Sequence, residues 1–374
     1  MKRLFERYRQ YQALPPEEVS RELRERRDEE RAREVVFVPE LDLGRTAWHE
    51  PPHPEAVNAA TFALRRRMNA YPDPGAREVR ELAAARHGVR PDQVAVGHGA
   101  AELLQDACAQ LIEGGELLVA WPGWRPLPDL AQRAGGRPVP VPGERSGDEA
   151  PGRGSGGVGP LAGRVGAETR AVALSSPNDP TGAPVARADV RALCERVGEH
   201  VWVLLDEAFA DFLEPGEDAA SLVAELPNLL VFRTFAKAHA MAGFRIGYVL
   251  APTAELAQRL TPSFSVNAPA QAAAAWALEL GDGVVARRRA AARRERERLA
   301  RALRGTSLSF APSSAPFVWL SSDAHDGEAI ATHLRIRRIV VAPGERWGDE
   351  RHVRITLRDA EATDRLIAAL RELG

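Results

Sequence analysis

Residues 229–248 read Leu229-Leu-Val-Phe-Arg-Thr-Phe-Ala-Lys-Ala-His-Ala-Met-Ala-Gly-Phe-Arg-Ile-Gly-Tyr248, a short apolar strand followed closely by a lysine. Lysine is scarce in this chain, where Lys2 and Lys237 stand against forty-eight arginines. Positions that need only a cation are therefore filled by arginine. Lysine differs from arginine in having an amine that can lose its proton and attack a carbonyl to form a Schiff base. A lysine left on a surface turn is the alternative, but the apolar surroundings of Lys237 favour a reactive amine.

Apolar strands alternate with helical segments on both sides of this stretch. Continuous apolar runs separated by helices are typical of a parallel sheet that is covered on both faces. After a long helical stretch at about 268–303, further strands predict a second and smaller α+β segment. The sequence thus predicts an α/β fold. The predicted strands are 94–96, 117–120, 170–174, 201–205, 229–232, 317–320 and 352–356.

The chain divides into parts of different character. Residues 1–35 are heavily charged and predict a helical N-terminal arm that is either exposed or packed against a partner. A large domain is expected at 56–269, and a small domain is expected to combine 36–55 with 270–374. Pro142 to Pro160 is rich in Gly, Ser and Pro, which predicts a mobile loop.

Composition limits the classes of function. The 374 residues are 44% hydrophobic, enough for a full core, and the formal net charge of −2 creates no field that favours nucleic acid or anionic membranes. No signal-peptide core or membrane-spanning run is seen, so a soluble cytoplasmic protein is expected. The arginine runs 65–67 and 287–289 are expected to be solvated helix faces. Cys108 and Cys194 are expected to be buried thiols, and no spacing of metal ligands occurs.

Polar residues follow several of the predicted strands, at the place where open α/β sheets bind ligands. After the glycine turn 97–99, the backbone N–H groups of Ala100 and Ala101 would open a helix and point at an anion. Asp206 ends an apolar strand, where a carboxylate needs a cationic partner to stay charged. A structural glycine turn and a helix-capping aspartate are the alternatives. The loop 175–182 is either a rigid polar loop or simply a turn.

Seven blocks, taken in this order, resemble the fold-type I pyridoxal-phosphate (PLP) enzymes. The nearest branch is the histidinol-phosphate aminotransferase-like group of class I/II aminotransferases. The resemblance implies PLP-transferase fold type I, with a large domain around a mainly parallel sheet and a smaller α+β domain. It implies a transaminase that moves an amino group between an amino acid, or an amino-acid-like phosphate ester, and a 2-oxo acid. The matching blocks are 71–75, 97–102, 121–124, 177–182, 206–209, 234–245 and 353–356.

The resemblance also implies roles around the ring of the cofactor. Lys237 would hold PLP as a Schiff base and then move the α-proton of the substrate. Asp206 would keep the pyridine nitrogen protonated, which makes the ring an electron sink. Trp124 would stack on the ring, although a tryptophan between prolines could also serve packing alone. Tyr71 would reach the phosphate across the interface of a homodimer.

The resemblance also implies which residues would bind the cofactor phosphate and the substrate. The N–H groups of Ala100 and Ala101, the Thr234 hydroxyl and Arg245 would hold the phosphate. Arg354 resembles the arginine that grips the substrate α-carboxylate through a bidentate fork. An arginine on the surface edge of a strand is the alternative.

Three residues depart from the family pattern near the cofactor. Asp179 stands where asparagine is common and Phe209 where tyrosine is common, both near the phenolic O3′ of PLP. O3′ would therefore have fewer hydrogen-bond donors, and Asn178 could supply the amide instead. Ala236 replaces a serine that often donates to the phosphate, so cofactor binding would depend more on Thr234 and Arg245.

The substrate is less closely defined by the resemblance. In histidinol-phosphate aminotransferases, a small-domain arginine stands close to the position that Ala342 and Pro343 occupy here. The segment of this chain around Ala342 and Pro343 is more similar to that of general amino-acid aminotransferases. A PLP-dependent threonine-phosphate-type decarboxylase is an alternative on the same scaffold. A non-catalytic PLP-binding regulatory protein is an alternative of another class. The absence of a recognisable helix-turn-helix in residues 1–35 argues against this alternative.

Overall fold

The computed structural model describes residues 24–25, 39–143 and 158–373. By its internal contacts the chain separates into two units, residues 1–41 and 42–374. The predicted charged arm lies outside the described residues, except for the helical residues 24 and 25.

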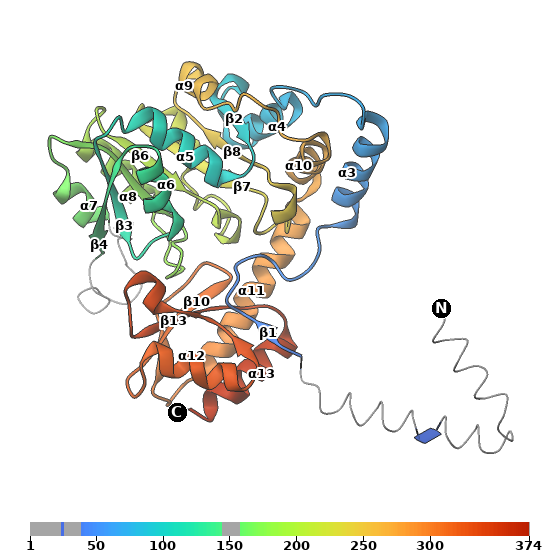
Figure 1. Ribbon diagram of the computed structural model, residues 1–374, viewed down its shortest axis with the longest axis vertical. Helices are drawn as coiled ribbons and strands as arrows, with labels where there is room; N and C mark the ends of the chain where they lie inside the picture. Colours follow the sequence, from blue (N-terminus) through green and yellow to red (C-terminus); the bar gives the residue numbers. More distant parts are fainter. Residues whose placement is uncertain (1–23, 26–38, 144–157, 374) are drawn as a thin grey trace, which may run out of the picture. The chain divides into compact units, whose positions relative to one another are not determined.

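A seven-stranded sheet forms the centre of the second unit (Figure 1). Neighbouring strands are parallel except at β8, which is antiparallel to both of its neighbours. The sheet is therefore mainly parallel, as predicted. In spatial order its strands are β2 (Val94–Gly97), β8 (Gly247–Leu250), β7 (Leu229–Thr234), β6 (Trp202–Asp206), β5 (Thr169–Ser175), β3 (Glu116–Trp121) and β4 (Arg137–Pro142).

Successive residues of each strand enter two different hydrophobic clusters, because side chains alternate between the faces of a sheet. Ala171 and Ala173 of β5 belong to one cluster, whereas Val172 and Leu174 belong to the other. The cluster with Ala171 is covered by α5 (Ala100–Leu111), α6 (Pro126–Arg133) and α9 (Ala254–Arg259). The opposite cluster is covered by α3 (Pro54–Arg67), α4 (Arg77–His87), α7 (Val158–Arg164), α8 (Arg187–Val197) and α10 (Ala268–Leu280).

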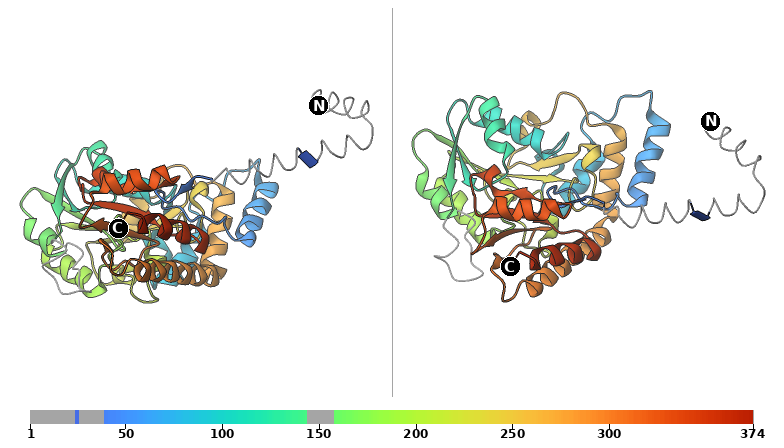
Figure 2. Two further views of the ribbon diagram at one scale, coloured as in Figure 1. Left: turned by 90° about the horizontal axis from the view of Figure 1, so that it is seen from below. Right: turned by 60° about the horizontal axis from the view of Figure 1, so that its bottom comes forward.

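A second sheet is formed by the C-terminal part of the chain. Its four strands are all antiparallel. Helices α11 and α13 lie side by side next to it (Figure 2). In spatial order the strands are β12 (Ala342–Pro343), β13 (His352–Thr356), β10 (Phe317–Ser322) and β9 (Leu308–Phe310); the helices are α11 (Asp282–Ala302), α12 (Gly327–Ile336) and α13 (Ala360–Arg371).

Shorter elements complete the described part of the chain. They are β1 (Leu41–Asp42), β11 (Ile339–Val340) and the 3-10 helices η1 (Pro91–Gln93), η2 (Ala210–Phe212), η3 (Ala220–Ala224), η4 (Ala242–Phe244) and η5 (Gly344–Trp347).

The structure differs from the sequence-based expectations at several elements, and strands β8 and β9 were not predicted. Strand β4 was not predicted because it carries three prolines, which are tolerated at the edge of a sheet. The long helix predicted at 268–303 is two helices, α10 and α11, which meet at Gly281. Pro142 belongs to β4 and Val158 begins α7, so the predicted loop 142–160 is too long at both ends; residues 144–157 lie outside the described residues.

The arginine run 287–289 is not the solvated face that was expected. Arg288 is buried, and it donates hydrogen bonds to the carbonyl oxygens of Ala238 and Pro51, each at 2.8 Å. By contrast Arg287 and the run 65–67 are exposed, and Cys108 and Cys194 are buried as predicted. No helix among the described residues is long and apolar enough to cross a membrane. The division into a large and a small domain stays a prediction.

Candidate active site

The carboxyl ends of β2, β3, β5, β6 and β7 lie at one edge of the seven-stranded sheet. These strands share one direction because the antiparallel β8 separates β2 from β7. The segments that follow them carry the predicted site residues: the start of α5, the loop 121–124, the loop 175–182, Asp206 and the loop 234–245. The fold thus brings most of the sequence-predicted site to the edge where open α/β sheets bind ligands.

Lys237 lies in the loop after β7, and its amine faces other polar groups. Its Nζ donates a hydrogen bond of 2.6 Å to Thr46 Oγ1 and lies 4.8 Å from the centre of the Phe209 ring. Burial lowers the pKa of Lys237; the charges of Arg354 and Arg245 lower it further, and those of Asp179 and Asp206 oppose the shift. The alternative of a lysine on a surface turn is therefore excluded.

Asp206 is the last residue of β6. Its Oδ1 accepts a hydrogen bond of 2.9 Å from the Ala208 N–H. Burial raises the pKa of Asp206 to about 6, while this N–H and the Lys237 ammonium oppose the increase. A cation that docked against Asp206 would lower its pKa and keep the carboxylate charged.

The start of α5 forms an anion cradle with Arg245. The residue before the helix, Gly99, provides no side-chain cap, so the first N–H groups of the helix are free of such a partner. Arg245 adopts a left-handed backbone with φ of 54°, and its Nη2 donates to the His98 carbonyl oxygen at 3.2 Å. The Thr234 hydroxyl accepts the Ala236 N–H at 3.1 Å and keeps its own proton to donate.

The close packing of this cradle fits a phosphate group. A Cβ on Gly99 would lie 2.7 Å from Arg245 Nη2, and a Cβ on Gly247 would lie 2.8 Å from the Ala100 backbone nitrogen. Glycine at both positions lets the guanidinium and the helix N-terminus approach one small volume. Phosphate binds at helix N-termini through the backbone N–H groups and the helix dipole. The residues present therefore suit the phosphate of PLP, and the half-buried amine of Lys237, with its lowered pKa, suits its aldehyde.

Arg354 and Asp179 form a buried ion pair whose charges act on Lys237. Arg354 Nη1 donates to Asp179 Oδ1, and Nη2 donates to the Gly44 carbonyl oxygen at 2.8 Å. Arg354 lies on the central strand β13, between β12 and β10, and its side chain is buried. The alternative of a surface arginine is therefore excluded.

The other predicted residues have different surroundings. Asn178 Nδ2 donates to the Pro122 carbonyl oxygen at 3.1 Å, and Asn178 Oδ1 accepts from Thr181, so this amide supports the loop. Trp124 packs against the cluster beneath α5 and α6. The Tyr71 side chain is 98% exposed, so within one chain it does not join the cluster around Lys237. The proposed cofactor contacts of all three stay predictions.

Thr46 and Trp347 belong to the site but were missed by sequence reasoning. Thr46 contacts Lys237 from the segment that precedes α3, and the Trp347 ring centre lies 5.1 Å from the Arg354 guanidinium carbon. The Trp347 indole donates to the Gly123 carbonyl oxygen at 3.0 Å, and the Trp121 indole donates to the Trp347 carbonyl oxygen at 2.8 Å. Neither residue lies in a recognisable motif, and only the tertiary structure brings them here.

A buried charge network that sequence reasoning also missed lies behind Asp206. Arg233 of β7 donates from Nη1 to Glu207 Oε2 at 3.0 Å and from Nη2 to Asp211 Oδ1 at 2.7 Å. Burial raises the pKa of Glu207 to about 7, and Arg233 opposes that increase. The network fixes the residue next to Asp206 and the residue next to Thr234.

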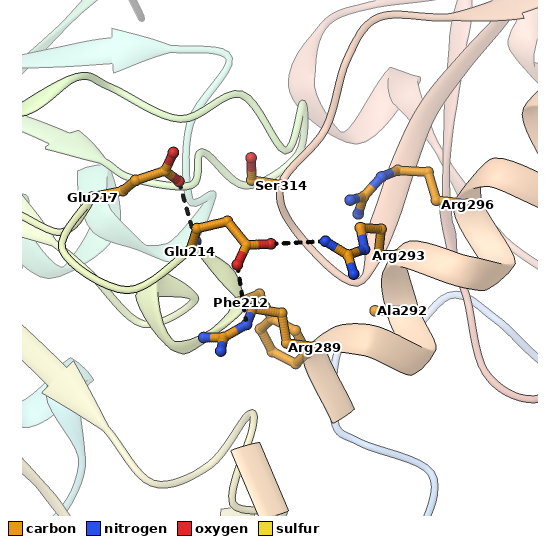
Figure 3. A pocket seen from close by; sticks show the side chains of 8 residues that line it. All are labelled: Phe212, Glu214, Glu217, Arg289, Ala292, Arg293, Arg296 and Ser314. Carbon is orange, nitrogen blue, oxygen red and sulfur yellow. Dashed lines mark hydrogen bonds and ion pairs between the residues drawn. The ribbon is translucent and has the colours of Figure 1, made fainter. Parts of the chain in front are cut away.

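A separate small pocket lies between η2 and α11 (Figure 3). Its charged side chains largely satisfy one another: Glu214 pairs with Arg293 at 3.1 Å and with Arg289 at 3.9 Å. None of the sequence-predicted site residues lines it, so it is not the candidate active site. Its lining residues are Phe212, Glu214, Glu217, Arg289, Ala292, Arg293, Arg296 and Ser314.

Comparison with known proteins agrees with this geometry. The family model described as aminotransferase class I and II matches residues 41–370. A histidinol-phosphate aminotransferase of Rubrobacter xylanophilus is 36% identical over 85% of this chain and 88% of the relative. An aromatic amino acid aminotransferase of Corynebacterium jeikeium is 35% identical over 84% of this chain and 82% of the relative. The crystal structure of histidinol-phosphate aminotransferase from Sinorhizobium meliloti in complex with pyridoxal-5′-phosphate has a TM-score of 0.78 at 25% identity and covers 91% of this chain and 94% of that chain.

Proposed function

Because the chain belongs to the class I and II aminotransferase family, we propose that it moves an amino group between an amino acid and a 2-oxo acid with PLP held at Lys237. The observation that carries this proposal is a half-buried lysine with a lowered pKa, on which the charge of Asp206 acts, at the carboxyl edge of a mainly parallel sheet. A surface lysine would be charged and solvated, and it would be a poor nucleophile.

PLP supplies an electron sink when it is bound. Ala100 and Ala101 would hold its phosphate through their backbone N–H groups, together with the Thr234 hydroxyl and the Arg245 guanidinium. Asp206 would hold the proton of the pyridine nitrogen, and Trp124 would cover one face of the ring. Asn178, Asp179 and Phe209 would border O3′, where the phenyl ring of Phe209 offers no donor.

Lys237 would also carry the proton that the reaction moves. In its neutral form the amine accepts a proton at Nζ, and the lowered pKa makes this form accessible nearer neutral pH. Thr46 accepts a hydrogen bond from Nζ and so orients it. Phe209 and Phe317, whose rings meet edge to face with centres 5.0 Å apart, help exclude water from this side.

Arg354 would bind the carboxylate of the amino donor and of the 2-oxo acid acceptor. We favour a general amino-acid aminotransferase, because Ala342 and Pro343 stand where a phosphate-binding arginine is expected. Histidinol phosphate is the second candidate, and it is favoured by the relatives that carry that name.

Domains and assembly follow the same proposal. The separate seven- and four-stranded sheets support a large domain at 56–269 and a small domain made of 36–55 and 270–374. The fully exposed Tyr71 supports a homodimer in which this side chain reaches the phosphate of the other subunit. We also propose that the enzyme acts in the cytoplasm.

An absorbance scan of the purified protein tests the function. With PLP, the unaltered chain should show the visible band of a Schiff base, and amino donors that yield 2-oxo acids should shift that band. Lys237→Ala should lose the band, whereas Lys2→Ala, which changes the only other lysine, should keep it. A protein that binds no added PLP contradicts the proposal. Release of carbon dioxide without a 2-oxo acid would indicate the decarboxylase, and a band that no amino donor shifts would indicate a regulatory protein.

A further inference from the structure

The ion pair between Asp179 and Arg354 occupies the group that the substrate carboxylate needs. Both side chains are buried, with exposed fractions of 6% for Asp179 and 8% for Arg354. The guanidinium lies among apolar rings, with its carbon 5.6 Å from the centre of Phe317 and 5.1 Å from that of Trp347. In surroundings of this kind an ion pair is only weakly screened by solvent.

Two of the three side-chain nitrogens of Arg354 have hydrogen-bond partners, and the third has none. Nη1 is bound to Asp179 and Nη2 to the Gly44 carbonyl oxygen, whereas Nε is buried and has no hydrogen-bond partner. A buried donor without a partner is unfavourable and indicates a missing acceptor. A fork of two parallel hydrogen bonds to a carboxylate must include Nη1 or Nη2, and each of these nitrogens already has one N–H bound.

The guanidinium of Arg354 already has a carboxylate partner before any ligand binds. The charges of Asp179, Asp206, Arg245 and Arg354 all act on Lys237, and Asp179 is also bound directly to Arg354. A ligand carboxylate would therefore be the second carboxylate at one guanidinium. An asparagine at position 179 would be neutral and could also donate a hydrogen bond.

We propose that Asp179 is a specificity-determining residue that competes with the substrate carboxylate for Arg354. This inference rests on the proposed function, in which Arg354 is the carboxylate site. It follows that Asp179 weakens the binding of every ligand that presents a carboxylate there. Ligands with a neutral group at the same position are not affected.

The test compares 3-phenylpropionate with its neutral amide, 3-phenylpropionamide. Neither compound has an amino group, so calorimetry reports binding alone, and the titration is done with the PLP-loaded and with the PLP-free protein. Asp179→Asn should bind the carboxylate about tenfold more tightly than the unaltered chain, because a competing buried charge has been removed. Its affinity for the amide should not change.

Three variants separate competition from a structural effect. In an Arg354→Gln background, Asp179→Asn should bring no gain in carboxylate affinity. Asp179→Ala is a second neutral variant, and it should gain affinity if the asparagine variant folds poorly. Asp326→Asn changes an exposed N-cap of α12 that is equally able to cap the helix, and it should bind both compounds like the unaltered chain.

The outcomes separate the inference from the function. The inference is overturned if the neutral variants bind the carboxylate no more tightly, if they gain equally for the amide, or if no chain binds the carboxylate. A chain that forms the Schiff base yet shows one of these results keeps the proposed function. A chain that binds no PLP but shows the tenfold gain loses the function and keeps the competition at Arg354.

Discussion

The pKa of Lys237 depends on its burial and on the charges of its neighbours. Burial lowers its pKa from the ordinary value of 10.5, and the two arginines near it act in the same direction. Asp179 and Asp206 oppose these effects. Each of these four charged side chains can therefore be substituted singly to change the pKa of the Lys237 amine.

Removing one carboxylate should change the pH dependence of the Lys237 amine. The rate at which PLP adds to the cofactor-free chain should rise with pH, with its midpoint below pH 10.5, because only the neutral amine attacks. Asp206→Asn removes a charge that favours the ammonium form, so the midpoint should move to lower pH. Stopped-flow absorbance across a pH series measures both midpoints.

Asp326→Asn is the control for this series, because it changes an exposed aspartate far along the chain on α12. Its midpoint should equal that of the unaltered chain. A shift of the Asp206→Asn midpoint to higher pH would contradict the charge arrangement described for Lys237.

The central residues of the site could be predicted, whereas their partners could not. Lys237 and Asp206 follow apolar strands, so their place at the sheet edge is a consequence of local pattern. Thr46 and Asp179 contact residues that lie more than a hundred positions away in sequence. Pairings at such separations depend on how the two sheets meet, which no local pattern encodes.

At the scale of elements, the glycine turn before α5 should determine the affinity for phosphate. Gly99→Ala would place a Cβ 2.7 Å from Arg245 Nη2 and so displace the guanidinium. The affinity for PLP should fall by about tenfold or more, since strain and displacement of this kind cost about 1–3 kcal/mol. The affinity for pyridoxal, which has no phosphate, should change much less. Titration followed by absorbance measures both.

Gly88→Ala is the matched control for this turn. Gly88 also has a positive φ, of 69°, but a Cβ there would meet no heavy atom within 4 Å. Both variants place an alanine at a positive φ, although Gly99, with ψ of 160°, is more demanding than Gly88, with ψ of 30°, and only Gly99→Ala closes the cradle. An equal loss of PLP and pyridoxal affinity in Gly99→Ala would show that the turn does not act on the phosphate.

The network that joins β6 to β7 should be important for stability. Arg233→Gln leaves Glu207 and Asp211 buried without their cation. Breaking a buried pair from one side typically lowers the free energy of unfolding by about 3–5 kcal/mol. Urea denaturation should therefore show a much lower midpoint for this variant.

Arg335→Gln provides the comparison on the surface. Arg335 pairs with Glu328 at 3.3 Å, with both side chains exposed, and such pairs contribute about 0–1 kcal/mol. Equal losses in the two variants would mean that the buried network does not stabilise the sheet.

The difference between buried and edge positions also explains which strands could be predicted from the sequence. The apolar runs of β5, β6 and β7 are buried on both faces, so their pattern is unambiguous. Strand β4 was missed because its prolines are tolerated only at an edge, and its position in the sheet is a tertiary fact. The break at Gly281 was missed because helical residues continue on both sides of it.

At the scale of the whole molecule, large apolar side chains are left exposed in and just after α3 and in the segment before α10. Scattered apolar residues are normal on a surface, but several on or near one helix favour an interface. This pattern supports the proposed homodimer. The exposed fractions are 61% for Phe62 and 74% for Met68 around α3, 98% for Tyr71 and 84% for Phe264.

Mixing two inactive variants tests whether the active site is shared. Tyr71→Ala and Lys237→Ala should each lose most activity, and a refolded equal mixture should recover about one quarter of it. Half of randomly paired dimers contain both variants, and each of these has one intact site. Sedimentation establishes the dimer, and activity assays follow the recovery. A monomer, or a mixture no more active than its components, contradicts a shared site.

The two indole hydrogen bonds between Trp121, Gly123 and Trp347 have a mechanical consequence. The Trp121 indole at the end of β3 donates toward η5, and the Trp347 indole of η5 donates back to the Gly123 carbonyl oxygen. Because the two bonds run in opposite directions, both must break before the end of β3 and η5 can separate. Arg354, whose guanidinium carbon lies 5.1 Å from the centre of the Trp347 ring, is thereby tied to the contact that joins the two sheets.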